Sequence, residues 1–146
     1  MTKLNSYLNF PGNTEEAFNF YKSIFGGEFV GGLMRFKDVA DLPGKENLSA
    51  VDLNKIMHVA LNIGDNMLMA TDTLESMGQH LTTGTNISLS LHPDSKKEAD
   101  RLYNALSAGG QPTMPMMDMF WGDYWGMLTD KFGIQWMVNY ASNQKK

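Results

Sequence analysis

Two segments of the chain repeat apolar residues with the 3.6-residue period of an amphipathic helix. Residues 13–25 and 94–108 both follow the i, i+3, i+4, i+7 spacing that places apolar side chains on one helix face. The predicted face positions are Ala17, Phe20, Tyr21, Ile24 and Phe25 in the first segment, and Ala99, Leu102, Tyr103 and Leu106 in the second. The pattern therefore predicts two helices, each with one face buried against another element.

Each predicted helix also has a start signal and a stop signal. Asn13 or Thr14 is expected to cap the first helix, and Asp94 or Ser95 the second, since these residue types satisfy free N–H groups at a helix start. Glycine pairs at 26–27 and 109–110 follow the last apolar positions and are expected to end the helices.

The other periodic segments are typical of strands. Strands are predicted at residues 4–10, 28–36, 56–63, 67–71, 86–91, 112–119, 124–129 and 134–140. Turns at 64–66 and 130–133 favour hairpins, Gly31 and Gly32 favour a bulge within a strand, and residues 38–54 are expected to form a loop. The order is strand, helix and three strands, twice over, although few residues match between the halves.

This order predicts an α+β fold made of two βαβββ modules in a single domain. Module one spans about residues 1–74, a polar linker about 75–84, and module two about 85–146. Each module is expected to contribute a curled mixed sheet, and the two sheets are expected to form a cleft.

Several strings of the sequence resemble the PhnB-like branch of the vicinal-oxygen-chelate (glyoxalase/bleomycin-resistance/dioxygenase) superfamily. They are YLNFPGN at residues 7–13, FYK at 20–22, FGG at 25–27, FWGDYWG at 120–126 and DKFG at 130–133, followed by Trp136. The resemblance covers nearly the whole chain. It implies paired βαβββ modules around a cleft, in agreement with the element order, and a homodimer.

The resemblance also implies positions for metal ligands, because the superfamily commonly holds a divalent ion on the first and fourth strands of each module. The side chains near those positions are Ser6, Asn86 or Ser88, Ala70 with Asp72 beyond it, and Met137 with Gln135 and Asn139 on the same face. Only Asp72 is a carboxylate, and one carboxylate holds a catalytic divalent ion poorly. We therefore expect no intact metal tetrad and predict no cofactor, although a divalent metal in a rearranged site stays open.

The three histidines do not rebuild a metal site by their spacing. His58, His80 and His92 match no HxH, HxxxH or HExxH pattern. His58 lies in a predicted strand, where it would serve as a general base if it faces the cleft, but its face is equally compatible with solvent. A Ser-His-Asp triad would combine Ser6 or Ser88 with His58 and Asp72, and their spacing gives it no support.

The C-terminal part of the chain is rich in aromatic residues and methionines. Phe120, Trp121, Tyr124, Trp125 and Trp136 fall within 17 positions, among Met114, Met116, Met117, Met119, Met127 and Met137. These residues suit either a small double-sheet core or an apolar pocket in which indole rings stack on a planar ligand and methionines adapt to its outline. Asp118 and Asp123 would favour a cationic ligand, and are also ordinary turn residues.

Composition and charge exclude several classes of protein. With no Cys among 146 residues, the chain has no disulfides, Cys-zinc sites, iron–sulfur clusters or thiol catalysis. A net charge of −4 without a basic stripe argues against nucleic-acid binding, and no apolar run reaches the length of a membrane helix. The N-terminal residues lack the apolar core of a signal peptide, so a cytoplasmic location is expected.

These observations predict a PhnB-like protein that binds a small molecule in an apolar cleft lined by aromatic residues and methionines. The predicted ligand-binding residues are Ser6, Ser88, Trp121, Trp125, Met137 and Asn139. The alternative is a glyoxalase- or dioxygenase-like enzyme with a rearranged metal site or a metal-free acid–base site, for which His58 and Asp72 are the candidates. A third possibility is a structural dimer whose own side chains fill the cleft. Some PhnB-like relatives carry a methyltransferase name, but no glycine-rich turn suited to a nucleoside cofactor follows a strand.

Overall fold

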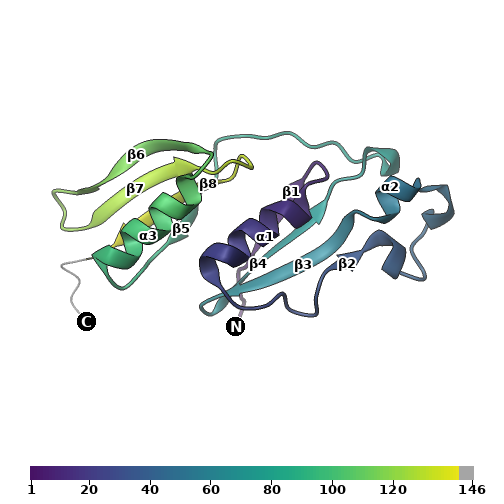
Figure 1. Cartoon of the computed structure of the whole chain (residues 1–146), viewed down its shortest axis with the longest axis horizontal. Helices are drawn as coiled ribbons and strands as arrows, with labels where there is room; N and C mark the ends of the chain where they lie inside the picture. The colour runs from purple at the N-terminus through teal and green to yellow at the C-terminus, as the bar shows by residue number, and fades with distance from the viewer. Residues whose placement is uncertain (142–146) are drawn as a thin grey trace. The chain divides into compact units, whose positions relative to one another are not determined.

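The fold is α+β and repeats one arrangement twice. The computed structural model describes residues 1–141. The chain divides into two compact units, Met1–Thr82 and Thr83–Lys146, and each unit is built on one four-stranded sheet. Strand, helix and three strands follow one another in both units (Figure 1), so the predicted βαβββ order is confirmed.

The first unit joins a mixed sheet to one long helix. Its elements are β1 (Ser6–Phe10), α1 (Thr14–Phe25), β2 (Met34–Arg35), η1 (Phe36–Asp38), η2 (Lys45–Asn47), α2 (Ala50–Leu53), β3 (Ile56–Ile63), β4 (Asn66–Asp72) and η3 (Glu75–Met77). The strand order is β1-β4-β3-β2, with β1 parallel to β4 and the other pairs antiparallel. Helix α1 packs on β3 and β4 and so covers one face of this sheet.

The second unit has the same topology with fewer additions. Its elements are β5 (Leu89–Leu91), α3 (Lys96–Ser107), β6 (Gln111–Asp118), β7 (Tyr124–Thr129) and β8 (Gln135–Tyr140). The strand order is β5-β8-β7-β6, again with one parallel pair, β5 and β8. Helix α3 packs on β6, β7 and β8, so this sheet also has a helix-covered face and a helix-free face.

The buried face of α3 is the predicted one. In α1 the predicted Ala17, Tyr21 and Ile24 are buried, whereas Phe20 and Phe25 are only half-buried. In α3 the buried residues are Ala99, Leu102, Tyr103 and Leu106, and Ser95 accepts a hydrogen bond from the Glu98 N–H as the predicted cap. In α1 they are Thr14, Ala17, Phe18, Tyr21 and Ile24. Phe18 is thus buried where Phe20 and Phe25 were expected, because the stripe starting at Thr14 fits the same period.

The predicted strand at 28–36 is wrong over most of its length. Only Met34 and Arg35 form β2, and Phe29 makes an isolated bridge to Leu61. Gly31 and Gly32 have φ of 75° and 76°, in the left-handed region that extended strands do not use. The two glycines therefore form a turn instead of the expected bulge.

The remaining boundaries differ mainly at strand ends. The strands predicted at 56–63 and 124–129 match β3 and β7, while β5 keeps only three residues of the predicted 86–91. The predicted loop at 38–54 contains the short helices η2 and α2. Within residues 1–141, no helix combines the length and the apolar character needed to cross a membrane.

Candidate functional site

Alternation along β7 and β8 divides the aromatic C-terminal region between two faces of the second sheet. Gly126, Leu128, Trp136 and Val138 are buried, and the register places Leu128 opposite Trp136 and Gly126 opposite Val138. These residues face α3. The Trp136 indole donates from Nε1 to Asp130 Oδ2 at 2.9 Å, so this tryptophan belongs to the core.

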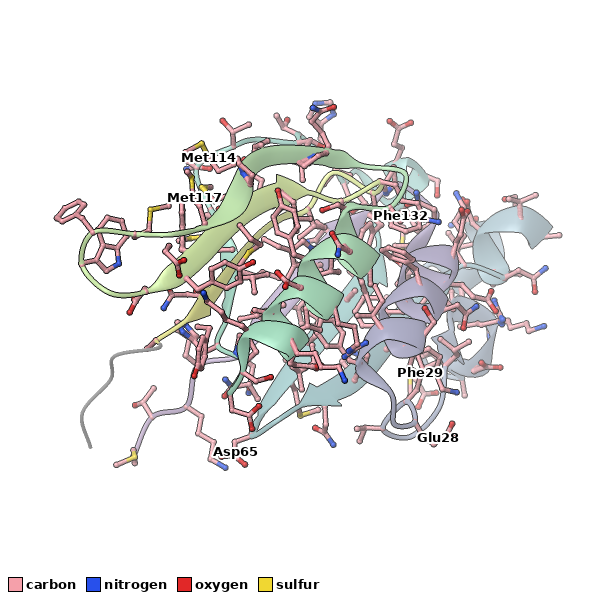
Figure 2. The ribbon with its side chains drawn as sticks, turned by 60° about the vertical axis from the view of Figure 1, so that its left-hand side comes forward. Glu28, Phe29, Asp65, Met114, Met117 and Phe132 are labelled. Atoms are coloured by element: carbon pink, nitrogen blue, oxygen red, sulfur yellow. The ribbon has the colours of Figure 1, made fainter. Side chains whose placement is uncertain are left out.

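The intervening residues form the helix-free face of the second sheet, which we call the methionine face. Register pairs place its members in adjoining rows across three strands: Met114, Met127 and Met137 in one row, and Met117, Trp125 and Asn139 in the next. Ser90 of β5 lies opposite Met137 and extends the first row. Figure 2 shows Met114 and Met117 projecting from β6, with sulfur atoms gathered around them.

A polar pair lies at one end of the methionine face. The Asn139 amide donates from Nδ2 to Asp123 Oδ2 at 3.0 Å. Asp118 forms an ion pair with Lys96 at 3.0 Å, which offsets its charge, whereas Asp123 has no ion-pair partner within residues 1–141. Of Asp118 and Asp123, only Asp123 therefore has no positively charged partner among residues 1–141.

Three of the six predicted ligand-binding residues share the methionine face, namely Trp125, Met137 and Asn139. Ser88 lies just before β5 and is half-buried. Trp121 lies in the turn between β6 and β7, 55% exposed, with its ring edge-on to Phe120 at a centroid distance of 4.9 Å. Trp121 thus lies outside the rows of the sheet.

Ser6 and Asp72 lie on the helix-covered face of the first sheet. Ser6 pairs with Leu68, and Phe10 pairs with Asp72. Leu68 and Asp72 are both buried. Asp72 is only 2% exposed. Its Oδ1 accepts the Thr14 N–H at 2.9 Å and its Oδ2 accepts the Ile56 N–H at 2.8 Å.

Asp72 therefore anchors the backbone of the first unit. The carboxylate from β4 caps α1, in place of the side-chain cap that the sequence predicted at Asn13 or Thr14. An anion at a helix N-terminus is also favoured by the helix dipole. With both oxygens engaged by backbone donors, Asp72 is poorly placed for acid–base chemistry or metal binding.

His58 lies on the opposite, helix-free face of the first sheet. Its Nδ1 is 3.2 Å from the hydroxyl oxygen of Tyr7, and the two rings are 5.8 Å apart between centroids. Tyr7 pairs with Met69, and Asn9 with Thr71, so these four residues share that face. His58 and Asp72 consequently occupy opposite faces of one sheet, and no Ser6–His58–Asp72 triad is assembled.

The other two histidines lie apart. His80 is exposed in the segment after η3, and His92 is exposed after β5, with Nε2 3.0 Å from Ser90 Oγ. Within residues 1–141 no group of three or more His, Cys, Asp or Glu is placed to hold a metal ion. The donor set found on the described residues does not fit the divalent site of the superfamily.

Two features of the site were missed by sequence reasoning. Tyr7 was passed over because the family position pointed to Ser6, although alternation with the half-buried Leu8 and the buried Phe10 places Tyr7 on the other face. The hydrogen bond between Asp123 and Asn139 joins a turn to β8, and no local sequence pattern predicts it.

A family model described as 3-demethylubiquinone-9 3-methyltransferase matches residues 2–139 of the chain. Several relatives match over nearly their full length. Protein PA1353 from Pseudomonas aeruginosa is 37% identical with a TM-score of 0.83, and the match covers 96% of this chain and 98% of that one. Protein YjdN of Escherichia coli K12 is 28% identical over 149 residues, 97% of each chain.

A PhnB protein from Bacillus cereus is 27% identical with a TM-score of 0.73, covering 96% of this chain and all of that one. A glyoxalase/bleomycin resistance protein/dioxygenase family enzyme from Burkholderia phytofirmans has 19% identity and a TM-score of 0.63 over 93% of this chain and 97% of that one, and shares the fold. The two modules thus have the fold of the glyoxalase/bleomycin-resistance/dioxygenase superfamily. The chain belongs to its PhnB-like family, as the sequence resemblance predicted.

Proposed function

We propose that the protein binds a small, planar aromatic molecule that carries a positive charge or N–H donors, and that the methionine face is its binding surface. The observation that carries this proposal is the position of Trp125 on the helix-free face, in the row next to that of Met127 and Met137. An indole ring stacks on planar or cationic groups, and flexible thioethers adapt to the outline of an apolar ligand.

The polar end of the methionine face supports the preferred charge of the ligand. The Asn139 amide nitrogen is engaged by Asp123, which leaves the amide oxygen and the second carboxylate oxygen as acceptors. Acceptors without a neighbouring base favour a ligand with N–H groups or a cation. A purely apolar ligand would leave these groups without partners.

Binding is tested by titrating the full chain with planar aromatic cations and with uncharged analogues of the same size. Indole fluorescence and the shift in Tm report binding. We expect saturable binding of the cations, at least a tenfold loss of affinity in Trp125→Leu, and a loss selective for cations in Asp123→Asn. Met116→Leu, on β6 but outside the two rows of the methionine face, is the matched control. No saturable binding by any probe would contradict the proposal.

The second candidate is a metal-free enzyme that uses His58 for acid–base chemistry. The specific observation in its favour is the contact of His58 with the Tyr7 hydroxyl on a helix-free face. Asp72 does not assist, because both of its oxygens bind backbone N–H groups. Loss of turnover in His58→Ala with unchanged binding at the methionine face would favour this candidate, once a substrate is found.

The methyltransferase description of the family is not carried over to this chain. A nucleoside-bound methyl donor is commonly held by a glycine-rich turn between a strand and a helix. Before α1 the chain runs through Pro11 and Gly12 to Asn13, and before α3 the connection from β5 contains no glycine. Neither connection has the glycine-rich form.

We further propose that the chain forms a homodimer, as its family resemblance implies. Sedimentation equilibrium of the full chain is the direct measurement. A mass of twice 16.3 kDa is expected, and a mass of 16.3 kDa at micromolar concentration would contradict the dimer.

A further inference from the structure

The helix-free face of the first sheet brings together a hydroxyl and an imidazole from strands that are not neighbours. Tyr7 lies on β1 and His58 on β3, and β4 runs between them. The Tyr7 hydroxyl nevertheless reaches His58 Nδ1 at 3.2 Å across the β4 residue Met69, which pairs with Tyr7. A contact that spans an intervening strand fixes the position of the imidazole ring.

The chemistry of the two groups favours one direction for the shared proton. A phenol is a stronger hydrogen-bond donor than a neutral imidazole N–H, and an imidazole nitrogen is a stronger acceptor than a phenol oxygen. Burial raises the pKa of Tyr7 from its ordinary value, which keeps the hydroxyl protonated. With Tyr7 donating to Nδ1, neutral His58 carries its proton on Nε2.

The strand residues that surround His58 on the helix-free face are uncharged, which suits an electron-rich ligand atom. Asp72 is the sole acid of β1, β2, β3 and β4, and it faces α1. The residues around His58 on the helix-free face include Asn9, Thr71 and Met34, all uncharged. An N–H donor in neutral surroundings attracts an oxygen that carries negative charge.

We propose that Tyr7 and His58 form a binding site for an oxygen anion such as a carboxylate or a phosphate. His58 donates to the anion from Nε2, and Tyr7 is the positioning residue that holds the ring and its tautomer. In this role His58 presents a donor, whereas a general base would need a free lone pair on Nε2. The argument for this site uses residues of the first unit alone and does not rest on ligand binding at the methionine face.

The test uses the full chain with ¹⁵N-labelled histidine, followed by NMR of the ring nitrogens. We expect His58 in the Nε2–H form, with Tyr7→Phe producing a mixture of tautomers. Benzoate and inorganic phosphate, added separately, are expected to shift the His58 signals saturably with one or both anions. Tyr7→Phe should weaken that binding at least fivefold and His58→Phe should abolish it.

His92→Phe is the matched control, because the imidazole of His92 also lies beside a hydroxyl, that of Ser90. It should leave the His58 shifts unchanged. His58→Gln keeps an N–H near the position of Nε2. It should retain part of the binding and replaces His58→Phe in the test if that variant fails to fold.

An Nδ1–H tautomer at His58, equal shifts at His80 and His92, or unchanged affinity in Tyr7→Phe would each overturn the proposal. Cation binding read through Trp125 should persist in Tyr7→Phe, which separates failure here from failure at the methionine face.

Discussion

At the scale of single residues, Asp72 shows how a carboxylate in a candidate catalytic position serves the fold. It ends β4, caps the start of α1 and holds the first residue of β3. Such a buried charge is tolerated because both oxygens accept hydrogen bonds from backbone N–H groups. The residue therefore ties together three segments that are distant in sequence.

Replacing Asp72 by Ala should lower the free energy of unfolding by about 3 kcal/mol, because two buried backbone donors lose a charged partner. Asp72→Asn keeps one acceptor oxygen and should cost less. Asp65→Asn, in the exposed turn between β3 and β4, is the control and should change stability by less than about 0.5 kcal/mol. Urea unfolding measures all three. Equal stability of Asp72→Ala and the control would show that the carboxylate is dispensable.

The ionisation of Tyr124 is expected to lower the free energy of unfolding at alkaline pH. Its hydroxyl donates to Asp100 Oδ1 at 2.6 Å, and this hydrogen bond, with burial and the negative charge of Asp100, raises the pKa of Tyr124 to about 12. The unfolded chain loses the proton near pH 10. Stability from this group is therefore complete below about pH 10 and is lost between about pH 10 and 12. Tyr124→Phe should flatten the fall in Tm over that window, and an unchanged slope would contradict the assignment.

At the scale of elements, β6 and β7 meet more closely than an ordinary strand pair. Gly126 pairs with Val138, and a Cβ at Gly126 would lie 2.7 Å from Met116 Sδ and 3.0 Å from the Met114 carbonyl oxygen. The β6–β7 register also shifts twice between Pro112 and Met117. The glycine thus permits the irregular β6 strand to pack against β7.

Gly126→Ala should destabilise the protein by about 2 kcal/mol, since a backbone carbonyl has to move to admit the methyl group. Gly84→Ala is the matched control, because its nearest neighbour would be the Asn86 side-chain oxygen at 3.6 Å, an ordinary contact. Thermal unfolding compares the two variants. If Gly126→Ala matched Gly84→Ala, the close approach of β6 and β7 would be more adaptable than the contacts indicate.

The elements that the sequence predicted well are those defined by local periodicity. The buried stripe of α3 and the bounds of β3 and β7 follow from spacing alone. The strand predicted at residues 28–36 was wrong. The alternation of apolar residues suggested a strand, but Gly31 and Gly32 adopt left-handed conformations that interrupt it. The sequence analysis did not separate Trp125 from Trp136, whereas the burial along β7 and β8 does.

At the scale of the whole molecule, the distribution of donors bears on metal binding. Within residues 1–141 no three His, Asp or Glu side chains are grouped to hold a metal ion, while thioethers gather on the methionine face. We therefore predict weak retention of divalent ions that prefer imidazole and carboxylate ligands.

Protein equilibrated with Zn²⁺, Ni²⁺ or Mn²⁺ and then dialysed against metal-free buffer should retain well under one ion per chain. Mass spectrometry of the metal content is the measurement. Near-stoichiometric retention, lost in Asp72→Asn or His58→Ala, would contradict our interpretation of the donor set and favour the rearranged metal site.

The sequence by itself determined the order of the elements, the family and the apolar face of α3, since each depends on residues that are close along the chain or on whole-chain resemblance. The tertiary structure decided which candidate residues are available for chemistry. Asp72 finds its donors 58 and 16 residues away, and Tyr7 lies 51 residues from His58. Only the pairing of distant strands therefore shows that both oxygens of Asp72 bind backbone N–H groups and that His58 lies on the helix-free face of its own sheet. Pairing between distant strands depends on sheet order and register, which periodicity within a single strand does not contain.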